Sequence, residues 1–267
     1  MIGTWWQRFY YAYFLGPDHP MKLRICYYLR RLMKDGRVTI PYDGSGWITV
    51  DELEFIERHI LLHGYYEPEV FETLMRFAQA DEVVWDIGAN VGSFSIRAMR
   101  DPRVALTCAF EPLPPTFTLL ARNVAMNPGM GMLWNLALSD SLEDQSLSFG
   151  TPGNIGMASM EDHSGSNQVT VRCSTMDHLV ENGFAKPPTL VKMDVEGWEG
   201  PVFRGSLKTL ARYPPKAIVF ESRSTAAGVL EQESLGAILK ENGYRFERIV
   251  RPQGTIEPRE NFIAVRS

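Results

Sequence analysis

From residue 82 onward, short apolar runs alternate with longer amphipathic segments. The apolar runs are expected to form strands at 83–87, 104–110, 132–138, 189–195 and 216–222. The segments between them have helical spacing and predict helices at 93–100, 116–126, 198–211 and 230–242. This alternation predicts an α/β fold, a doubly wound and mostly parallel sheet with helices on both faces.

Two further strand-like runs close the chain, at 244–250 and 261–267. Only a short stretch separates them, so we expect a close antiparallel pair at one end of the sheet. The run at 168–173 alternates between apolar and polar residues, which predicts an edge strand. No repeat with a fixed period interrupts this order, which argues against solenoids and propellers.

The first 80 residues have a different texture and predict an extension of helices and a β-hairpin. Residues 1–34 read as helical and amphipathic, and 37–50 reads as two strands around a Gly-rich turn. Asp51 is placed to cap a helix that runs to about Leu62, and Gly64 is placed to end it. Another helix begins at Pro68 and runs to about residue 79. We therefore expect an extension at 1–80 and a cofactor-binding sheet domain at 81–267.

The segment 139–167 is rich in Ser, Gly, Asp and Met and has little periodicity. A long irregular insertion of this kind is either a functional loop or a surface loop. Its residues 153–157 could form a flexible lid, and the sequence leaves both readings open.

Composition excludes several classes of protein. The 267 residues include 27 basic and 32 acidic side chains, a net charge of −5, which argues against a nucleic-acid partner. Three widely spaced cysteines form no metal-binding pattern and predict free thiols in a reducing, cytoplasmic location. The longest uncharged apolar run is too short to span a membrane.

The first candidate for chemistry is a glycine loop between a predicted strand and a predicted helix. It contains Asp86, Gly88, Asn90 and Gly92. Glycine lets the backbone turn sharply and lets a ligand approach closely. A dinucleotide fingerprint would need glycine at 90 and 93, where this chain has Asn and Ser. A smaller, less anionic ligand than a pyrophosphate is therefore expected.

Glu111 follows the next predicted strand, roughly 20 residues beyond the glycine loop. An acidic residue at that spacing is suited to hydrogen-bond the two hydroxyl groups of a ribose. The loop and Glu111 together predict a cofactor that contains a nucleoside. The plainer alternatives are a simple strand-to-helix turn and a solvated carboxylate.

The third candidate is the stretch KMDVEGWE at 192–199, which holds three carboxylates within six residues, Asp194, Glu196 and Glu199. Asp194 is expected at the carboxyl end of a central strand, where α/β sheets bind ligands. Like charges this close need a cation, a hydrogen-bond network or a raised pKa. Capping of the following helix is the alternative role for these residues.

These motifs resemble the FkbM-type family of S-adenosylmethionine-dependent methyltransferases. The resemblance rests on VVWDIGANVGSFS at 83–95, FEP at 110–112, NLALSD at 135–140, VTVRCSTMDHL at 169–179 and KMDVEGWE, with HGYYEPEVF at 63–71 upstream. It implies a seven-stranded, Rossmann-like class I methyltransferase sheet. Residues 1–60 carry no part of the resemblance.

The resemblance also implies a role for each matching residue toward S-adenosylmethionine. Asp86, Gly88, Asn90 and Gly92 would form the methionine side of the site, and Glu111 would bind the ribose. Asn135 and Ala137 would lie near the adenine, and Tyr66 and Glu67 would cover the cofactor. Asp194 would face the reacting sulfonium, which suits a cation.

We therefore expect O-methylation of a hydroxyl group on a sugar, a glycan or a polyketide-like natural product. Methyl transfer is an in-line displacement that depends mainly on alignment, and a hydroxyl acceptor also benefits from a base. Asp194 is the first candidate for that base and Glu196 the second, ahead of Glu199, His63 and His163. A divalent metal held by these carboxylates stays open, although no ligand spacing establishes one.

Two functions from other classes stay open on the sequence alone. One is an NAD-dependent Rossmann-fold oxidoreductase, against which the broken glycine fingerprint argues. The other is a cofactor-binding module without catalysis. The aromatic residues within 1–34 leave three roles open: packing against the core or in a homo-oligomer, peripheral membrane contact, and stacking on a sugar acceptor.

Overall fold

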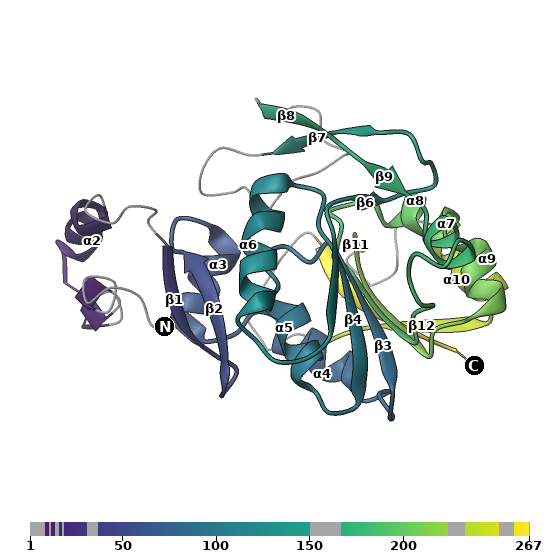
Figure 1. Ribbon diagram of the computed structural model, residues 1–267, viewed down its shortest axis with the longest axis horizontal. Helices are drawn as coiled ribbons and strands as arrows, with labels where there is room; N and C mark the ends of the chain where they lie inside the picture. The colour runs from purple at the N-terminus through teal and green to yellow at the C-terminus, as the bar shows by residue number, and fades with distance from the viewer. Residues whose placement is uncertain are drawn as a thin grey trace.

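A seven-stranded mixed sheet forms the centre of the molecule (Figure 1). The computed structural model describes residues 9–10, 12–13, 16–17, 19–30, 37–149, 167–223, 233–250 and 259–266. In order across the sheet, the strands are β12 (Tyr244–Arg248), β13 (Arg259–Arg266), β11 (Ala217–Arg223), β10 (Leu190–Met193), β3 (Glu82–Ile87), β4 (Val104–Phe110) and β5 (Gly131–Trp134).

The predicted doubly wound arrangement is confirmed. Strands β11, β10, β3, β4 and β5 run parallel, and β13 pairs antiparallel with both β11 and β12. The closing antiparallel pair was therefore predicted correctly. The order in which strands are added to the sheet reverses at β3, because β4 lies on one side of β3 and β10 lies on the other. Such a switch point opens a crevice at the carboxyl ends of the strands.

Helices cover both faces of the sheet. Successive side chains of a strand point to opposite faces, so neighbouring residues of β3 pack with different helices. Trp85 and Ile87 pack with α7 (Met176–Glu181), α8 (Glu199–Arg204), α9 (Leu207–Arg212) and α10 (Glu233–Glu241). Val84 faces the other way, toward α4 (Pro68–Met75) and α5 (Ser93–Arg100). Helix α6 (Pro114–Ala125) completes that second layer.

Two of the predicted elements are each divided into two in the structure. The single helix expected at 198–211 is two helices, α8 and α9, that are separated around Gly205. A Cβ at Gly205 would lie 1.9 Å from the carbonyl oxygen of Ser139, so the chain turns where two backbones touch. The strand expected at 132–138 is also two strands, since β6 (Ala137–Leu138) leaves the main sheet and pairs with β9 (Cys173–Ser174).

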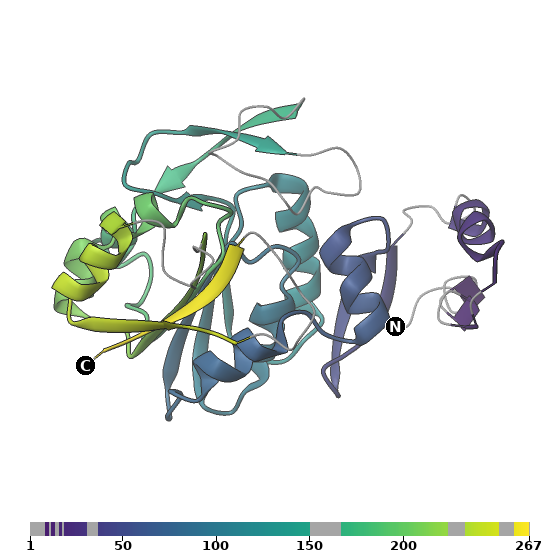
Figure 2. The same ribbon diagram turned by 180° about the vertical axis from the view of Figure 1, so that it is seen from behind.

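The segment that begins at residue 139 contains a strand that the sequence did not predict. Strand β7 (Gln145–Phe149) pairs antiparallel with β8 (Asn167–Val171), and the two form a ribbon of their own. The edge strand expected at 168–173 therefore does not join the main sheet. In both views this ribbon lies apart from the central sheet, at the top of the molecule (Figures 1 and 2). Residues 150–166, with the lid expected at 153–157, lie outside the described residues.

The extension contains the predicted hairpin and helices. Strands β1 (Arg37–Tyr42) and β2 (Gly46–Asp51) pair antiparallel, after which come α3 (Phe55–His63) and α4. Gly64 ends α3 with φ of 81°, as predicted. Asp51 does not cap α3, because its side chain accepts a hydrogen bond from the Leu53 N–H and Glu54 occupies the N-cap position. Helix α4 ends at Met75, earlier than expected.

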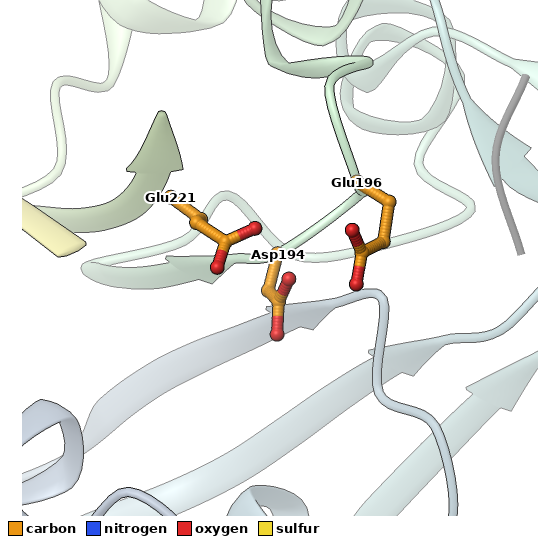
Figure 3. A group of neighbouring side chains, drawn as sticks. All are labelled: Asp194, Glu196 and Glu221. Carbon is orange, nitrogen blue, oxygen red and sulfur yellow. The ribbon is translucent and has the colours of Figure 1, made fainter. Parts of the chain in front are cut away.

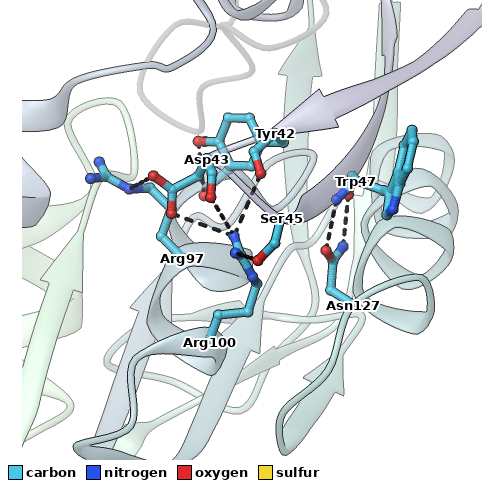
Figure 4. A network of polar contacts seen from close by, with 8 residues as sticks. Tyr42, Asp43, Ser45, Trp47, Arg97, Arg100 and Asn127 are labelled. Atoms are coloured by element: carbon cyan, nitrogen blue, oxygen red, sulfur yellow. Dashed lines mark hydrogen bonds and ion pairs between the residues drawn. The ribbon is translucent and has the colours of Figure 1, made fainter.

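Asn123 of α6 and Asn127, which follows this helix, attach the hairpin to the sheet domain. Figure 4 shows Asn127 beside Trp47. Asn127 accepts from the N–H of Trp47 and donates to its carbonyl, at 2.8 and 2.7 Å. Asn123 makes the same pair of hydrogen bonds to Thr49 one turn away, and also donates to the carbonyl of Val91. Side-chain amides therefore replace the strand that β2 lacks on this side, which satisfies buried backbone groups.

Charged side chains of α5 hold the turn of the same hairpin. Arg100 donates to the carbonyl of Asp43 at 2.9 Å, and Arg97 forms an ion pair with the Asp43 carboxylate at 3.6 Å (Figure 4). The apolar side of the hairpin shares one cluster with Val91, Ile96 and Leu119 of the sheet domain. The boundary near residue 80 stays a prediction, since the two parts pack as neighbours.

One of the predicted roles for the N-terminal aromatics has direct support. Tyr10 is buried in the same cluster as the hairpin, and its hydroxyl donates to Glu52 at 2.7 Å. Helix α2 (Lys22–Arg30) follows, and Leu29 packs against that cluster. Trp5 and Trp6 lie outside the described residues. Within the described ranges, no helix has both the length and the apolar character of a membrane span.

Cys108 and Cys173 are buried free thiols, as the sequence predicted for them. The side chain of Cys26 lies outside the described part of the chain.

Asn123→Ala should lower the free energy of unfolding by about 2–4 kcal/mol, because it leaves buried groups of Thr49 and Val91 without partners. Urea unfolding would measure the change. Asn127→Ala is the matched control, since Asn127 is only half-buried, and it should cost about half as much. Equal losses in the two variants would contradict the role given to Asn123.

Glu57 should make the protein less stable as the pH rises. Burial raises the pKa of Glu57 from 4.5 to about 8. Between these two pH values, the folded chain keeps a proton that the unfolded chain loses. The free energy of unfolding should then fall between pH 5 and pH 8. Glu57→Gln should reduce that fall by on the order of 2 kcal/mol in urea titrations, whereas the exposed Glu143→Gln should leave it unchanged. An identical fall in Glu57→Gln would refute the assignment.

Candidate active site

A pocket opens at the carboxyl ends of β3, β4, β10 and β11, at the switch point of the sheet. The extension contributes Ile56, Tyr66 and Glu67 to its wall, and β7 contributes Leu147. Of the residues that the sequence assigned to a site, eight line the pocket: Tyr66, Glu67, Gly88, Asn90, Glu111, Ala137, Asp194 and Glu196. Three others, Asp86, Gly92 and Asn135, support these residues from behind.

The glycine loop connects β3 to α5 and needs its glycines for two different reasons. Gly88 has φ of 78°, and a Cβ there would lie 1.8 Å from the carbonyl oxygen of Asp194. Gly92 has φ of 92° at the N-cap of α5, where a Cβ would lie 2.7 Å from Leu120. Asn90 also has a positive φ, 49°, a region that Asn tolerates better than most residues. The loop is therefore pressed against both the backbone that follows β10 and helix α6.

Asp86 lies beneath this loop and does not face the pocket. Its side chain is fully buried, accepts a hydrogen bond from the Ser95 hydroxyl at 2.6 Å, and lies 3.3 Å from the Lys192 ammonium group. Its charge is already balanced by Lys192. Asp86 therefore fixes the loop from below, and direct contact with a ligand is left to Gly88 and Asn90.

Glu111 joins the end of β4 to the glycine loop. Its carboxylate accepts hydrogen bonds from the backbone N–H groups of Asn90 and Leu113, both at 2.9 Å. Burial raises the pKa of Glu111 to about 7, although these hydrogen bonds and Lys192 act in the opposite direction. A carboxylate can accept further hydrogen bonds on its remaining lone pairs. Glu111 can therefore hold the loop and bind hydroxyl groups in the pocket at once.

Asn135 and Ala137 follow β5 on the same side of the pocket. The Asn135 amide donates to the carbonyls of Glu111 and Pro112, both at 2.9 Å, so it ties two strand ends together. Ala137 lines the pocket together with its neighbours Leu136 and Leu138. This side of the pocket is apolar, which suits the flat face of a purine base.

Tyr66 and Glu67 form the opposite wall. Glu67 precedes Pro68 and has φ of 44°, an unfavourable conformation for a residue in that position. Its carboxylate accepts a hydrogen bond from Asn261 of β13 at 3.0 Å. Three of the five non-glycine residues with positive φ in the described ranges line the pocket: Glu67, Asn90 and Glu196. Backbone strain concentrated in this way is typical of functional sites.

Three carboxylates meet at one end of the pocket. Oxygen atoms of Asp194, Glu196 and Glu221 all lie within 4.8 Å of one another (Figure 3). Burial raises the pKa of Glu221 to about 10, and the negative charges of Asp194 and Glu196 raise it as well. Such a group is stable only when a proton or a cation offsets the repulsion.

Lys192 is the cation beside this group. Its ammonium nitrogen lies 3.5 Å from a carboxylate oxygen of Asp194 and donates to the carbonyl of Gly88 at 3.0 Å. Its side chain is buried, and the charges of Asp86 and Asp194 raise its pKa against the effect of burial. One ammonium group therefore connects the glycine loop, the floor of the pocket and the proposed base.

Lys192 and Glu221 were not among the site residues expected from the sequence. A signal was present in both cases, since each is a charged residue within an apolar strand. A charge in a buried strand requires a partner of opposite charge or a polar pocket. Which of these applies depends on the neighbouring strands, and the order of the strands was not part of the prediction.

Glu199 supports the loop between β10 and α8 and does not line the pocket. Its carboxylate accepts from the N–H groups of Val195 and Gly197, both at 3.3 Å, which favours the capping role over that of a base. His63 is exposed and lies outside the pocket lining. His163 falls outside the described residues.

Comparisons with known proteins identify the family of this chain. A sequence model of the FkbM methyltransferase domain matches residues 86–246. Hexuronic acid methyltransferase AglP of Haloferax volcanii is 33% identical over 183 residues, which cover 67% of this chain and 73% of that protein. Methyltransferase 1 of Beauveria bassiana is 28% identical over 176 residues, which cover 58% of this chain and 67% of that protein.

Among solved structures, methyltransferase FkbM from Methylobacillus flagellatus aligns with a TM-score of 0.49 and 14% identity. The alignment covers 79% of this chain and 52% of that one. The family domain extends over more than half of the chain and includes the glycine loop, Glu111 and the carboxylate group. This chain is therefore a methyltransferase that belongs to the FkbM family.

Proposed function

We propose that this enzyme transfers a methyl group from S-adenosylmethionine to a hydroxyl group of a sugar, with Asp194 as the base. The observation that carries the proposal is the separation of apolar and acidic residues within one pocket. Glu111 and the glycine loop lie toward the apolar wall at Ala137, and the three carboxylates lie beside Gly88 on the neighbouring strands. One pocket thus offers a nucleoside site next to a group that can accept a proton.

The residues present fit S-adenosylmethionine. Gly88 leaves no room for a side chain at the loop, and Glu111 presents a buried carboxylate to the pocket, as the binding of a ribose requires. The cofactor supplies a methyl group on a positively charged sulfur. Carboxylates of Glu67, Asp194 and Glu196 line the pocket, and their charge favours a sulfonium cation.

The enzyme's own part is alignment and removal of one proton. Asp194 is held from two sides, since its N–H donates to the Ile87 carbonyl at 2.9 Å and its carboxylate pairs with Lys192. As the acceptor oxygen forms its bond to the methyl carbon and the bond from that carbon to sulfur breaks, the hydroxyl proton would move to the Asp194 carboxylate. Fixed alignment and general base catalysis together account for the rate that the enzyme must provide.

A sugar acceptor is supported by the relationship to AglP, whose name states that it methylates hexuronic acid. The acceptor side of the pocket is lined by carboxylates, which accept hydrogen bonds from hydroxyl groups. Leu147 of β7 and Ile56 of the extension add apolar side chains to the pocket lining. The family match argues against the NAD-dependent oxidoreductase that the sequence alone left open.

Glu111→Ala should weaken the binding of S-adenosylmethionine by about 1–3 kcal/mol, the scale of lost charged hydrogen bonds. Isothermal titration calorimetry would measure the change. The exposed Glu143→Ala is the control and should bind like the wild type. Unchanged affinity in Glu111→Ala would argue strongly against Glu111 as the ribose ligand.

Asp194→Asn should lower kcat by about 10²–10⁴-fold, the usual contribution of a general base, while cofactor affinity changes little. The assay is formation of S-adenosylhomocysteine with a panel of sugar and polyketide-like acceptors. His63→Ala is the control and should keep full activity, because His63 lies outside the pocket. Full activity in Asp194→Asn would remove this residue as the base. Cofactor binding without turnover of any acceptor would indicate a binding module.

A further inference from the structure

Glu221 belongs to the active site through the order of the strands. It lies in β11, which pairs in parallel with β10, and the register places Phe220 opposite Met193. Asp194, which follows Met193, is therefore the neighbour of Glu221 at the same edge of the sheet. Figure 3 shows Glu221 and Glu196 on either side of Asp194. Carboxylate oxygens of the three residues lie within 4.8 Å of one another.

The negative charges that act on Glu221 come from two parts of the chain. Asp194 and Glu196 lie in the loop after β10, Glu199 begins α8, and Glu67 precedes α4. Lys192 is the cation of β10, and its ammonium group lies 3.5 Å from Asp194 and 3.3 Å from Asp86. Three negative charges this close repel one another strongly in a partly buried site.

The ammonium group of Lys192 lies 3.5 Å from Asp194. It stabilises the negative charge of Asp194 directly, and the carboxylates around Glu221 act in the opposite sense on that residue. Burial has the same effect, since it favours the neutral form of a carboxylic acid. A single proton on Glu221 therefore relieves the repulsion and leaves Asp194 ready to accept another.

We propose that Glu221 is a positioning residue that stays protonated at neutral pH and holds the Asp194 carboxylate in its ionised, proton-accepting form. The inference rests on the proposed role of Asp194 as the base. During methyl transfer, the bond between sulfur and the methyl carbon breaks, and the bond between that carbon and the acceptor oxygen forms. The acceptor proton moves to Asp194, and Glu221 keeps its own proton throughout.

The test compares Glu221→Gln with Glu221→Ala in the full-length enzyme. Glutamine resembles the protonated acid in shape and charge, so kcat of Glu221→Gln should stay within about threefold of the wild type. Alanine removes the hydrogen-bond donor beside Asp194, so kcat should fall by at least about tenfold, while KM for S-adenosylmethionine changes little. Equal loss of kcat in both variants would overturn the proposal.

Infrared difference spectroscopy tests the protonation state without any turnover. The spectrum of the wild type minus Glu221→Gln at neutral pH should contain the carbonyl stretch of a protonated carboxylic acid. A carboxylate signal in its place would overturn the proposal. So would activity that is lost with EDTA and restored by Mg²⁺, because a cation would then offset the repulsion.

The same measurements separate this inference from the proposed function. Full activity of Asp194→Asn, with the acid signal of Glu221 still present, would refute the base while the protonation of Glu221 stands. An inactive Asp194→Asn together with an ionised Glu221 would refute the inference alone.

Discussion

A chain of buried charges joins the ends of two neighbouring strands, and the active site is built around it. Asp86 on β3 and Lys192 on β10 lie opposite one another in the sheet, and the ammonium group of Lys192 also contacts Asp194 and the carbonyl of Gly88. A buried ion pair contributes little net stability, because desolvation offsets most of the attraction. Removal of one partner is costly, since it leaves an uncompensated buried charge. The arrangement therefore specifies a geometry more than it stabilises the fold.

The contacts of Lys192 set the distance between the glycine loop and the carboxylates. Gly88 touches the backbone of Asp194 so closely that no side chain would fit, and Glu111 holds the same loop from the other side. Asn90 of this loop and Glu196 of the carboxylate group both have positive φ angles. A loop fixed by three strands has little freedom left to lose on binding, and such preorganisation is what an alignment-driven reaction requires.

The extension also contributes to the active site, because it forms a wall on a side of the pocket that the sheet leaves open. Asn123 and Asn127 fix β2 to α6, and Asn123 also contacts Val91 in the glycine loop. Tyr66 and Glu67 then form a wall that the sheet alone does not provide. The hydrogen bond from Asn261 to Glu67 connects this wall to the last strand, so residues from both ends of the chain meet at one site.

The sequence by itself determined the fold class, the glycine loop, Glu111 and the carboxylates after β10. Each of these depends on local order along the chain: hydrophobic period, turn chemistry and spacing from a strand end. The boundaries of α8 and the separate ribbon of β7 and β8 could not be predicted in this way, because close backbone contact at Gly205 and pairing across a long insertion decided them. The same limit applies to Lys192 and Glu221. Their charges are visible in the sequence, but only the order of strands β11, β10 and β3 decides that one balances Asp86 and the other joins Asp194. Electrostatic interactions depend on distance in space, and only the tertiary structure sets that distance.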